Sequence, residues 1–224
     1  MHAQAPGPTP ASVGAAVAAL AALALLAPAP AAADPGPSLR PRTVEAVQQK
    51  LAELGYLPEA GVDGIWGAQS RAATIAFQKW EGLVRDGIPG PVTQTALASA
   101  TRPRPLTGGP GTRIEILLDR QLLLLVRKGK VARTIHVSTG RDRFATPAGS
   151  YEILRKRRKS WSIPYKVWLP WASYFVGGIA IHQSRSVPVR RASHGCVRVT
   201  RYDARWLYLR TPVGTPVRVL KRSS

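Results

Sequence analysis

The sequence predicts an α+β multidomain protein in which a small three-helix N-terminal module precedes a mainly-β domain. Charge divides its 224 residues into three blocks. Residues 1–33 have no Asp, Glu, Lys or Arg, residues 34–100 have 6 basic and 7 acidic residues, and residues 101–224 have 26 basic and 5 acidic residues. Apolar residues recur at helical spacing in the second block and form strand-like runs in the third.

Composition excludes several classes of protein. Hydrophobic residues make up 45% of the chain, which is enough for a buried core and argues against global disorder. The single cysteine, Cys196, rules out an intramolecular disulfide and a four-thiolate metal site, and the sequence predicts no metal and no cofactor. A net charge of +20 predicts polyanionic surroundings, namely nucleic acid, acidic lipid or an acidic wall polymer.

Residues 1–33 have the features of a signal peptide. Val13–Ala27 is an unbroken run of small apolar residues, shorter than the roughly 20 residues needed to span a bilayer. Ala31–Ala33 fits a signal-peptidase site, so we expect cleavage after Ala33 and export to the cell wall or extracytoplasmic space. The segment before the run has only His2 in place of Lys or Arg, which leaves retention as an anchor as the alternative. A lipobox cysteine is missing, which excludes a lipoprotein.

The second block has the spacing of three short helices. Thr43 can cap a first helix, and Gly55 is suited to ending it. A second helix is expected over Gln69–Trp80, and a third from Pro91, a favoured first helical residue, to about Ala98. The apolar positions of the first helix are Val44, Val47, Leu51 and Leu54.

Two turns in this block share one pattern. Asp63–Ser70 and Asp86–Thr93 both read D-G-I-x-G-x-x-[ST], 23 residues apart. Asp-Gly favours a turn, the isoleucine is expected to fill the core, and the second glycine is expected to adopt a positive φ before the next helix. We interpret the repeat as structural.

The stretch over residues 40–100 resembles the three-helix peptidoglycan-binding module of wall enzymes. The resemblance rests on LAELGYLPEAGVDGIWGAQSRAATIAFQ and DGIPGPVTQTAL, and it implies a role in wall targeting. Residues 101–111 are rich in proline and glycine and are expected to form an exposed linker. The two domains are accordingly expected to have separate cores.

The third block is predicted to be mainly β. Arg113–Leu118 and Gln121–Arg127 are rich in Ile, Leu and Val and predict a hairpin. The capping box Thr200–Asp203 opens a short helix that ends near Leu209. Further strands are expected at Val131–Ser138, Ser150–Leu154, Gly178–His182 and Thr215–Leu220.

A run of five cations, Arg155–Lys159, is interpreted as a solvated loop that could also face anionic wall polymers or membrane lipid. His136 lies within a predicted strand and is expected to be structural. Several aromatic residues are expected to line the core or a groove, some as a lid over the substrate: Trp161, Trp168, Trp171, Tyr174 and Phe175.

The segment around Cys196 carries the chemistry. A lone cysteine is more often a small buried hydrophobe than a nucleophile, but SHGCVR places Gly195 before the thiol, where a reacting carbonyl can approach the backbone. The amides around Gly195 and Cys196 are candidates for holding an oxyanion. A thiol nucleophile needs a base or cation nearby, and His182 ends an apolar strand fourteen residues upstream.

Together SHGCVRV, the upstream IH, VSTG and TPAGSY resemble the L,D-transpeptidase catalytic domain, over residues 112–221. The resemblance implies that Cys196 is the nucleophile and His182 the general base. It also implies that the backbone carbonyl of Gln183 orients the imidazole. We expect the imidazolium of His182 to favour the thiolate.

Four more residues take their expected roles from the same resemblance. His194 and Gly195 match the motif that flanks the nucleophile, with His194 hydrogen-bonded within the site. Ser193 and Arg198 match positions that shape the substrate pocket, although Arg198 stands where some members have Asn.

The implied function is transfer of an acyl group within peptidoglycan. Cys196 attacks a tetrapeptide stem, a terminal D-amino acid leaves, and an amine of a neighbouring stem resolves the thioester to make a cross-link. Attack by water would give an L,D-carboxypeptidase, and attack by a free D-amino acid would give an exchange enzyme. The expected partners are peptidoglycan stem peptides and glycan, with anionic wall polymers as a further possibility and carbapenem β-lactams as covalent inhibitors.

Two other classes of function compete with this one. The N-terminal module fits a non-catalytic wall-binding protein, but the intact pair of Cys196 and His182 argues against that class. The positive charge fits a nucleic-acid binder, but no helix-turn-helix, zinc-finger or RNA-binding motif accompanies it, and export would remove the ligand. No nucleic-acid partner is therefore expected.

Overall fold

The computed structural model describes residues 43–222, so the predicted signal peptide and its cleavage site lie outside the described residues. As predicted, Thr43 caps the first helix by accepting a hydrogen bond from the Ala46 N–H at 3.2 Å, and Gly55 follows its end with a φ of 81°. None of the helices in the described part of the chain could cross a membrane. The first helices are α1 (Val44–Glu53), α2 (Ala68–Glu81) and α3 (Pro91–Ser99).

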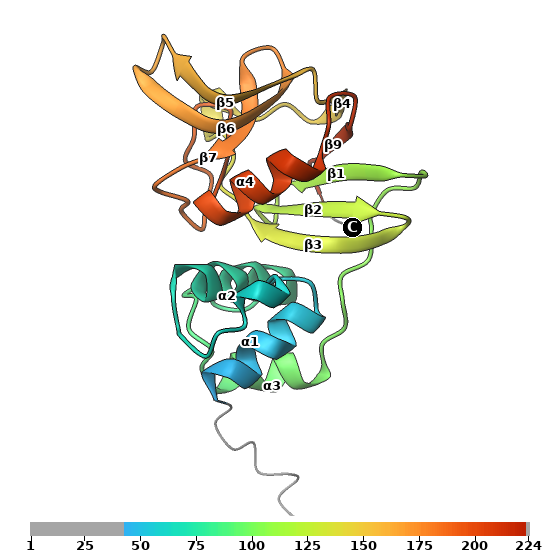
Figure 1. The fold of residues 1–224 in the computed structure, drawn as a ribbon, viewed down its shortest axis with the longest axis vertical. Helices are drawn as coiled ribbons and strands as arrows, with labels where there is room; N and C mark the ends of the chain where they lie inside the picture. The colour runs from blue at the N-terminus through green and yellow to red at the C-terminus, as the bar shows by residue number, and fades with distance from the viewer. Residues whose placement is uncertain (1–42, 223–224) are drawn as a thin grey trace, which may run out of the picture. The chain divides into compact units, whose positions relative to one another are not determined.

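Two sheets follow the helices, which confirms the predicted α+β class (Figure 1). The first has the order β3-β2-β1-β9-β4 and the second β5-β6-β7-β8. The first sheet contains β1 (Thr112–Leu117), β2 (Leu122–Arg127), β3 (Lys130–His136), β4 (Gly149–Glu152) and β9 (Pro216–Leu220). The second contains β5 (Arg155–Ser162), β6 (Val167–Val176), β7 (Ile179–Gln183) and β8 (Val197–Val199), and helix α4 (Arg201–Arg210) follows it.

Strand β2 is buried on both faces. Leu122, Leu124 and Val126 belong to a core shared with the three helices. Leu123 and Leu125, which point to the opposite face, belong to the core shared with the second sheet and α4. The expectation of separate domain cores is therefore wrong: the helices cover one face of the first sheet, where Figure 1 places them beside β2 and β3.

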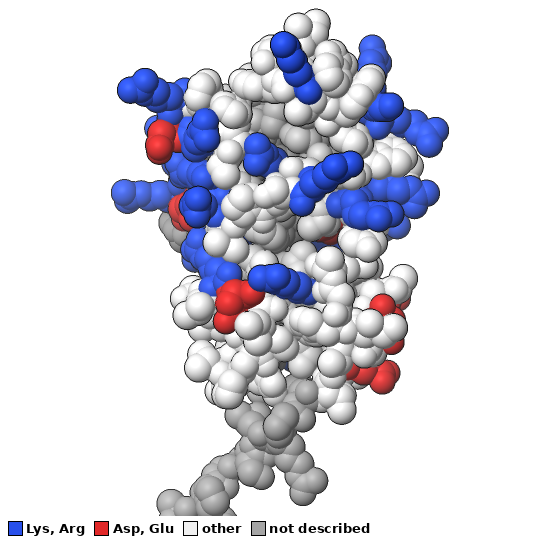
Figure 2. All heavy atoms as spheres, turned by 90° about the vertical axis from the view of Figure 1, so that its left-hand side faces the viewer, with Lys and Arg blue, Asp and Glu red and all other residues white. Residues whose placement is uncertain are grey.

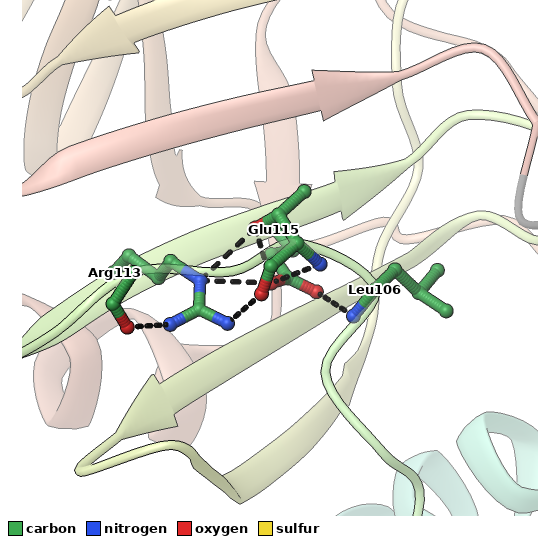
Figure 3. Close-up of polar contacts among 5 residues, drawn as sticks. Leu106, Arg113 and Glu115 are labelled. Carbon is green, nitrogen blue, oxygen red and sulfur yellow. Dashed lines mark hydrogen bonds and ion pairs between the residues drawn. The ribbon is translucent and has the colours of Figure 1, made fainter.

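The segment before β1 is exposed over most of residues 101–111, as its composition predicts, but its middle is held against the first sheet. Glu115 is fully buried and accepts hydrogen bonds from the N–H of Leu106 at 2.8 Å and of Thr107 at 3.1 Å. Arg113 forms an ion pair with the same carboxylate, with Nε 2.9 Å from Oε1 (Figure 3). These contacts fix residues 106 and 107 against the first sheet, because a buried carboxylate needs partners for its oxygens.

Each copy of the D-G-I repeat surrounds one buried glutamine. Nε2 of Gln48 lies 2.8 Å from Asp63 Oδ1, 3.0 Å from the Ile65 carbonyl and 2.8 Å from Ser70 Oγ. Its Oε1 accepts a hydrogen bond from the Gly64 N–H at 2.8 Å. Gln78 makes the equivalent four contacts in the second copy, with Asp86, Gly87, Ile88 and Thr93.

This arrangement corrects two expectations about the repeat. Ile65 is 70% exposed and Ile88 is 61% exposed, so neither fills the core; each faces the glutamine with its carbonyl group instead. The positive φ falls on the first glycine of each copy, at 72° for Gly64 and 73° for Gly87. The second glycine has an extended conformation and caps the following helix.

The cationic run 155–159 forms strand β5 and is not a loop. It pairs with β6, and three of its cations lie against aromatic rings of that strand while remaining exposed on their other side. The guanidinium of Arg155 lies 3.7 Å from the centre of the Tyr174 ring, and Nζ of Lys159 lies 4.1 Å from that of Trp168. Long cationic side chains can occupy a half-exposed strand because their stems and charges pack on aromatic faces.

The glutamine contacts generate a stability prediction. Gln48→Ala should lower the free energy of unfolding by about 1–3 kcal/mol, because it leaves the turn amide and the Asp63 carboxylate without their partner. Urea unfolding measures the change, and Gln49→Ala is the matched control, since Gln49 is exposed on the same helix. Equal stability of the two variants would contradict the structural role of the repeat.

Candidate active site

Parallel pairing of β7 with β8 brings the predicted nucleophile and base together. The register pairs His182 with Arg198. Cys196 immediately precedes β8 and lies level with Ala180, whose N–H points to Sγ at 3.5 Å. Because alternate residues of a strand share a face, His182 lies on the same face as Ala180, one step further along β7. Cys196 and His182 line one cavity.

His182 is buried and its ring is oriented by its neighbour. Nδ1 lies 2.7 Å from the backbone carbonyl of Gln183, the contact that the resemblance implies. A carbonyl only accepts, so Nδ1 carries the proton and Nε2 is the basic nitrogen. Burial lowers the pKa of His182 to about 4; the hydrogen bond to Gln183 opposes this and the charge of Arg198 adds to it. The imidazole is therefore neutral at pH 7.

Cys196 is half-buried, and burial raises the pKa of its thiol, against the effects of the Ala180 N–H and the Arg198 charge. The structure shows no hydrogen bond between the thiol and His182, although both lie among the described residues. The site at rest thus holds a neutral thiol and a neutral imidazole. Burial penalises both charges, which argues against the imidazolium that the sequence analysis expects to favour the thiolate.

The turn before Cys196, residues 193–195, is held by its own side chains and is called the nucleophile turn after the role that the resemblance implies for Cys196. Ser193 is buried, and its Oγ donates to the Cys196 carbonyl at 2.5 Å and accepts from the Gly195 N–H at 3.1 Å. Thr146 donates to the Gly195 carbonyl at 2.6 Å. Gly195 has a φ of 111°, which other residues rarely adopt. Because the Gly195 N–H already donates to Ser193 Oγ, it is not the free oxyanion donor that the sequence predicts.

His194 is held by three residues that the sequence analysis missed. Its ring stacks on Tyr165 at 4.7 Å between centroids and meets Phe144 edge-on, also at 4.7 Å. Nη2 of Arg141 lies 3.0 Å from its Nε2, and since a guanidinium only donates, that nitrogen accepts. Arg141 and Phe144 lie between the predicted VSTG and TPAG turns, which is the one signal that could have indicated them.

A cavity of about 1100 Å³ opens beside the thiol and is large enough for a short peptide. The β5–β6 hairpin, the end of β7 and the nucleophile turn form its walls. Trp161 and Trp168 line it, as expected for groove aromatics, whereas Trp171 packs against the core and Tyr208. The walls include Trp161, Tyr165, Trp168, His182, Cys196 and Arg198.

The described residues contain no cluster of His, Cys, Asp and Glu that could hold a metal ion. A cysteine and a neutral histidine that face one peptide-sized cavity are the arrangement of a cysteine-dependent acyl-transfer enzyme. Residues 111–219 match the family model of the L,D-transpeptidase catalytic domain, and residues 40–97 match that of a putative peptidoglycan binding domain. The chain belongs to the L,D-transpeptidase family.

Solved structures support this assignment. A crystal structure of an L,D-transpeptidase from Xylanimonas cellulosilytica is 38% identical with a TM-score of 0.74, and the match covers 80% of this chain and 93% of that one. A crystal structure of an L,D-transpeptidase from Stackebrandtia nassauensis is 28% identical with a TM-score of 0.53, over 81% of this chain and 92% of that one.

Curated relatives match shorter stretches. "Probable L,D-transpeptidase 3" of Mycobacterium tuberculosis is 31% identical over 97 residues, which are 36% of either chain. The N-acetylmuramoyl-L-alanine amidase CwlL of Bacillus licheniformis is 39% identical over 72 residues, 31% of this chain and 20% of that protein. The matches thus span about a third or less of these relatives' lengths.

A neutral Cys196 thiol beside a neutral His182 imidazole predicts how Cys196 reacts with iodoacetamide. Its alkylation rate should rise through the alkaline range without a plateau near neutrality, because burial raises the pKa of the thiol. Arg198→Gln should move the profile to still higher pH, since the lost charge favours the thiolate. The measurement is the alkylation rate against pH for wild type and variant. A wild-type plateau between pH 5 and 7 would show a preformed ion pair and contradict this description.

Proposed function

We propose that the protein is an exported cysteine L,D-transpeptidase that remodels or cross-links peptidoglycan, with Cys196 as nucleophile and His182 as general base. The observation that carries the proposal is the contact of His182 Nδ1 with the Gln183 carbonyl, which leaves Nε2 to accept a proton in the cavity that Cys196 lines. Family membership supports acyl transfer as the reaction. The match of residues 40–97 supports peptidoglycan as the ligand.

The reaction follows from the neutral resting state. As Sγ of Cys196 attacks the carbonyl between the L-centre of a diamino acid and the terminal D-amino acid, the thiol proton passes to Nε2 of His182. The same proton then goes to the nitrogen of the departing D-amino acid, and a thioester remains on Cys196. An acceptor amine attacks this thioester, gives up a proton to His182 and forms the new amide bond, and the proton returns to the thiolate.

The acceptor decides between the related activities. An amine of a neighbouring stem gives a cross-link, water gives an L,D-carboxypeptidase product, and a free D-amino acid gives exchange. All three share the first half-reaction, so the proposal rests on thioester formation. A non-catalytic wall-binding role is disfavoured because nothing in such a role needs a basic nitrogen and a thiol in one cavity.

Turnover of muropeptide tetrapeptides tests the proposal. Cys196→Ala should abolish release of the D-amino acid, since the chain has no second thiol. His182→Ala should slow release by about 10²–10⁴-fold, the range for loss of a general base. Gln183→Ala is the matched control and should be mild, because only its backbone carbonyl contacts His182. Near-wild-type release by the Cys196→Ala variant would refute the assignment.

The cations of β5 support an anionic wall polymer as an additional partner. Figure 2 shows Lys and Arg gathered on the upper part of one face, above the region of the helical module. Lys156 and Arg158 lie over the rings of Tyr208 and Trp171, at 4.2 Å and 5.3 Å from their centres. No ion pair found within residues 43–222 involves a residue of β5, so the exposed cations of this strand are available to an anionic ligand.

Sedimentation with cell walls tests this partner. Changing Arg157, Arg158 and Lys159 together to Gln should weaken binding to walls that carry phosphate-rich polymers, and the difference from wild type should shrink as NaCl is raised. The matched control changes Arg127, Lys128 and Lys130, three exposed cations around the β2–β3 turn, in the same way. The proposal would be contradicted if the two triple variants lost wall binding equally, or if the β5 variant also lost binding to walls without the polymer. Either result would mean that the net charge of the protein, and not the β5 strand, determines binding.

A further inference from the structure

Lys79 is a lysine buried between α2 and the first sheet, with 1% of its surface exposed. Its Nζ lies 2.9 Å from the Gln121 carbonyl, 3.0 Å from the Val137 carbonyl and 2.7 Å from Nδ1 of His136. Nε2 of His136 lies 2.8 Å from the Val187 carbonyl and must carry the ring proton. Nδ1 therefore accepts. Burial lowers the pKa of Lys79 to about 6, but three acceptors around Nζ match the three protons of the ammonium form.

One acceptor of Lys79, the carbonyl of Gln121, lies on a residue that supports the nucleophile turn through Thr139. The side chain of Gln121 makes two 2.8 Å hydrogen bonds with Thr139, one to its Oγ1 and one from its N–H. The Thr139 carbonyl then accepts from the N–H groups of Ala192 and Ser193, both at 3.0 Å. A continuous chain of hydrogen bonds thus leads from the helical module to the residues just before Cys196.

The loop between β7 and β8 joins His182 to Cys196, and the same region of the first sheet holds it at other points. His136 holds Val187, as described above. Oγ of Ser138 donates to the Arg190 carbonyl at 2.7 Å. A loop with few apolar contacts of its own depends on such hydrogen bonds for its conformation.

We propose that Lys79 is a positioning residue for the nucleophile turn, so that the helical module is a working part of the acyl-transfer site as well as a wall anchor. Burying an ammonium group is costly unless its donors are satisfied, and here two backbone carbonyls and a neutral imidazole satisfy them. Without Lys79 those acceptors lose their donor and the loop that they support is free to shift. A shift of about 1 Å in a reacting group is enough to reduce a rate strongly.

This inference rests on the proposed function of Cys196, and the test separates the two. The probe is meropenem, a carbapenem, and intact-mass spectrometry follows its addition to Cys196 in the full chain. The apparent dissociation constant and the first-order acylation rate constant are fitted separately. If wild type neither forms this adduct nor releases the D-amino acid from a muropeptide, the proposed function fails; if it lacks only the adduct, the variants are compared by the rate of that release.

Lys79→Met keeps the length of the side chain and removes the three donors. The acylation rate constant should fall about tenfold or more, while the dissociation constant changes less than twofold, because the groove walls are untouched. Leu97→Ala is the matched control: Leu97 is fully buried in the core between the helices and the first sheet, and its side chain has no hydrogen-bonding group, so its loss should lower stability without removing a hydrogen bond of this chain. Acylation by Lys79→Met at the rate of Leu97→Ala would overturn the inference.

Thr139→Val is the second variant, and it decides the outcome if Lys79→Met does not fold. It removes the Gln121–Thr139 Oγ1 bond at the far end of the chain with little change of shape. A slower acylation step with an unchanged dissociation constant is expected. Where Lys79→Met folds, the double variant should be no slower than Lys79→Met alone, since both changes break one chain. Wild-type acylation by Thr139→Val would overturn the inference.

Discussion

The burial of β2 on both faces is the constraint on which the rest of the structure depends. Its five residues from Leu122 to Val126 are fully buried, and each such side chain contributes about 1.5–3 kcal/mol relative to an exposed one. Exposing either face would forfeit several of these contributions at once. The helical module therefore covers one face while the second sheet and α4 cover the other, and this double cover places Lys79 against the end of β3.

The chemistry of the site follows from a second pairing, that of β7 with β8. Two parallel strands place a histidine and a cysteine on one face, one step apart, with Arg198 directly beside the histidine. Burial suppresses charge on both groups, and the Gln183 carbonyl selects the tautomer that can accept a proton. In the proposed mechanism the thiolate therefore forms as Cys196 attacks, and the charge of Arg198 favours it.

The sequence predicted correctly those features of the fold that are specified by a few neighbouring residues. The Thr43 cap, the Gly55 stop, the β1–β2 hairpin and the Thr200 N-cap, whose side chain bonds to Asp203, are all present because each is specified within a few positions. The failures lie where distant elements decide. Ile65 is exposed, and its carbonyl is the group that faces inward, to a glutamine 17 residues away. The β5 cations form a strand because β6 supplies aromatic rings for them to pack on. The burial of Lys79 was missed, and the only sequence signal for it is that Lys79 shares a helix face with Ala72 and Ala76.

The central claim is that Cys196 forms a thioester with a stem peptide and expels its terminal D-residue. Rapid-quench intact-mass spectrometry of the enzyme mixed with a tetrapeptide muropeptide tests it most directly, with peptide mapping to locate the adduct. The account predicts, within the first turnover, an adduct on the peptide that contains Cys196, with the mass of the stem minus its terminal D-amino acid. An adduct that retains that residue, an adduct at another position, or product release with no adduct at any quench time would contradict it.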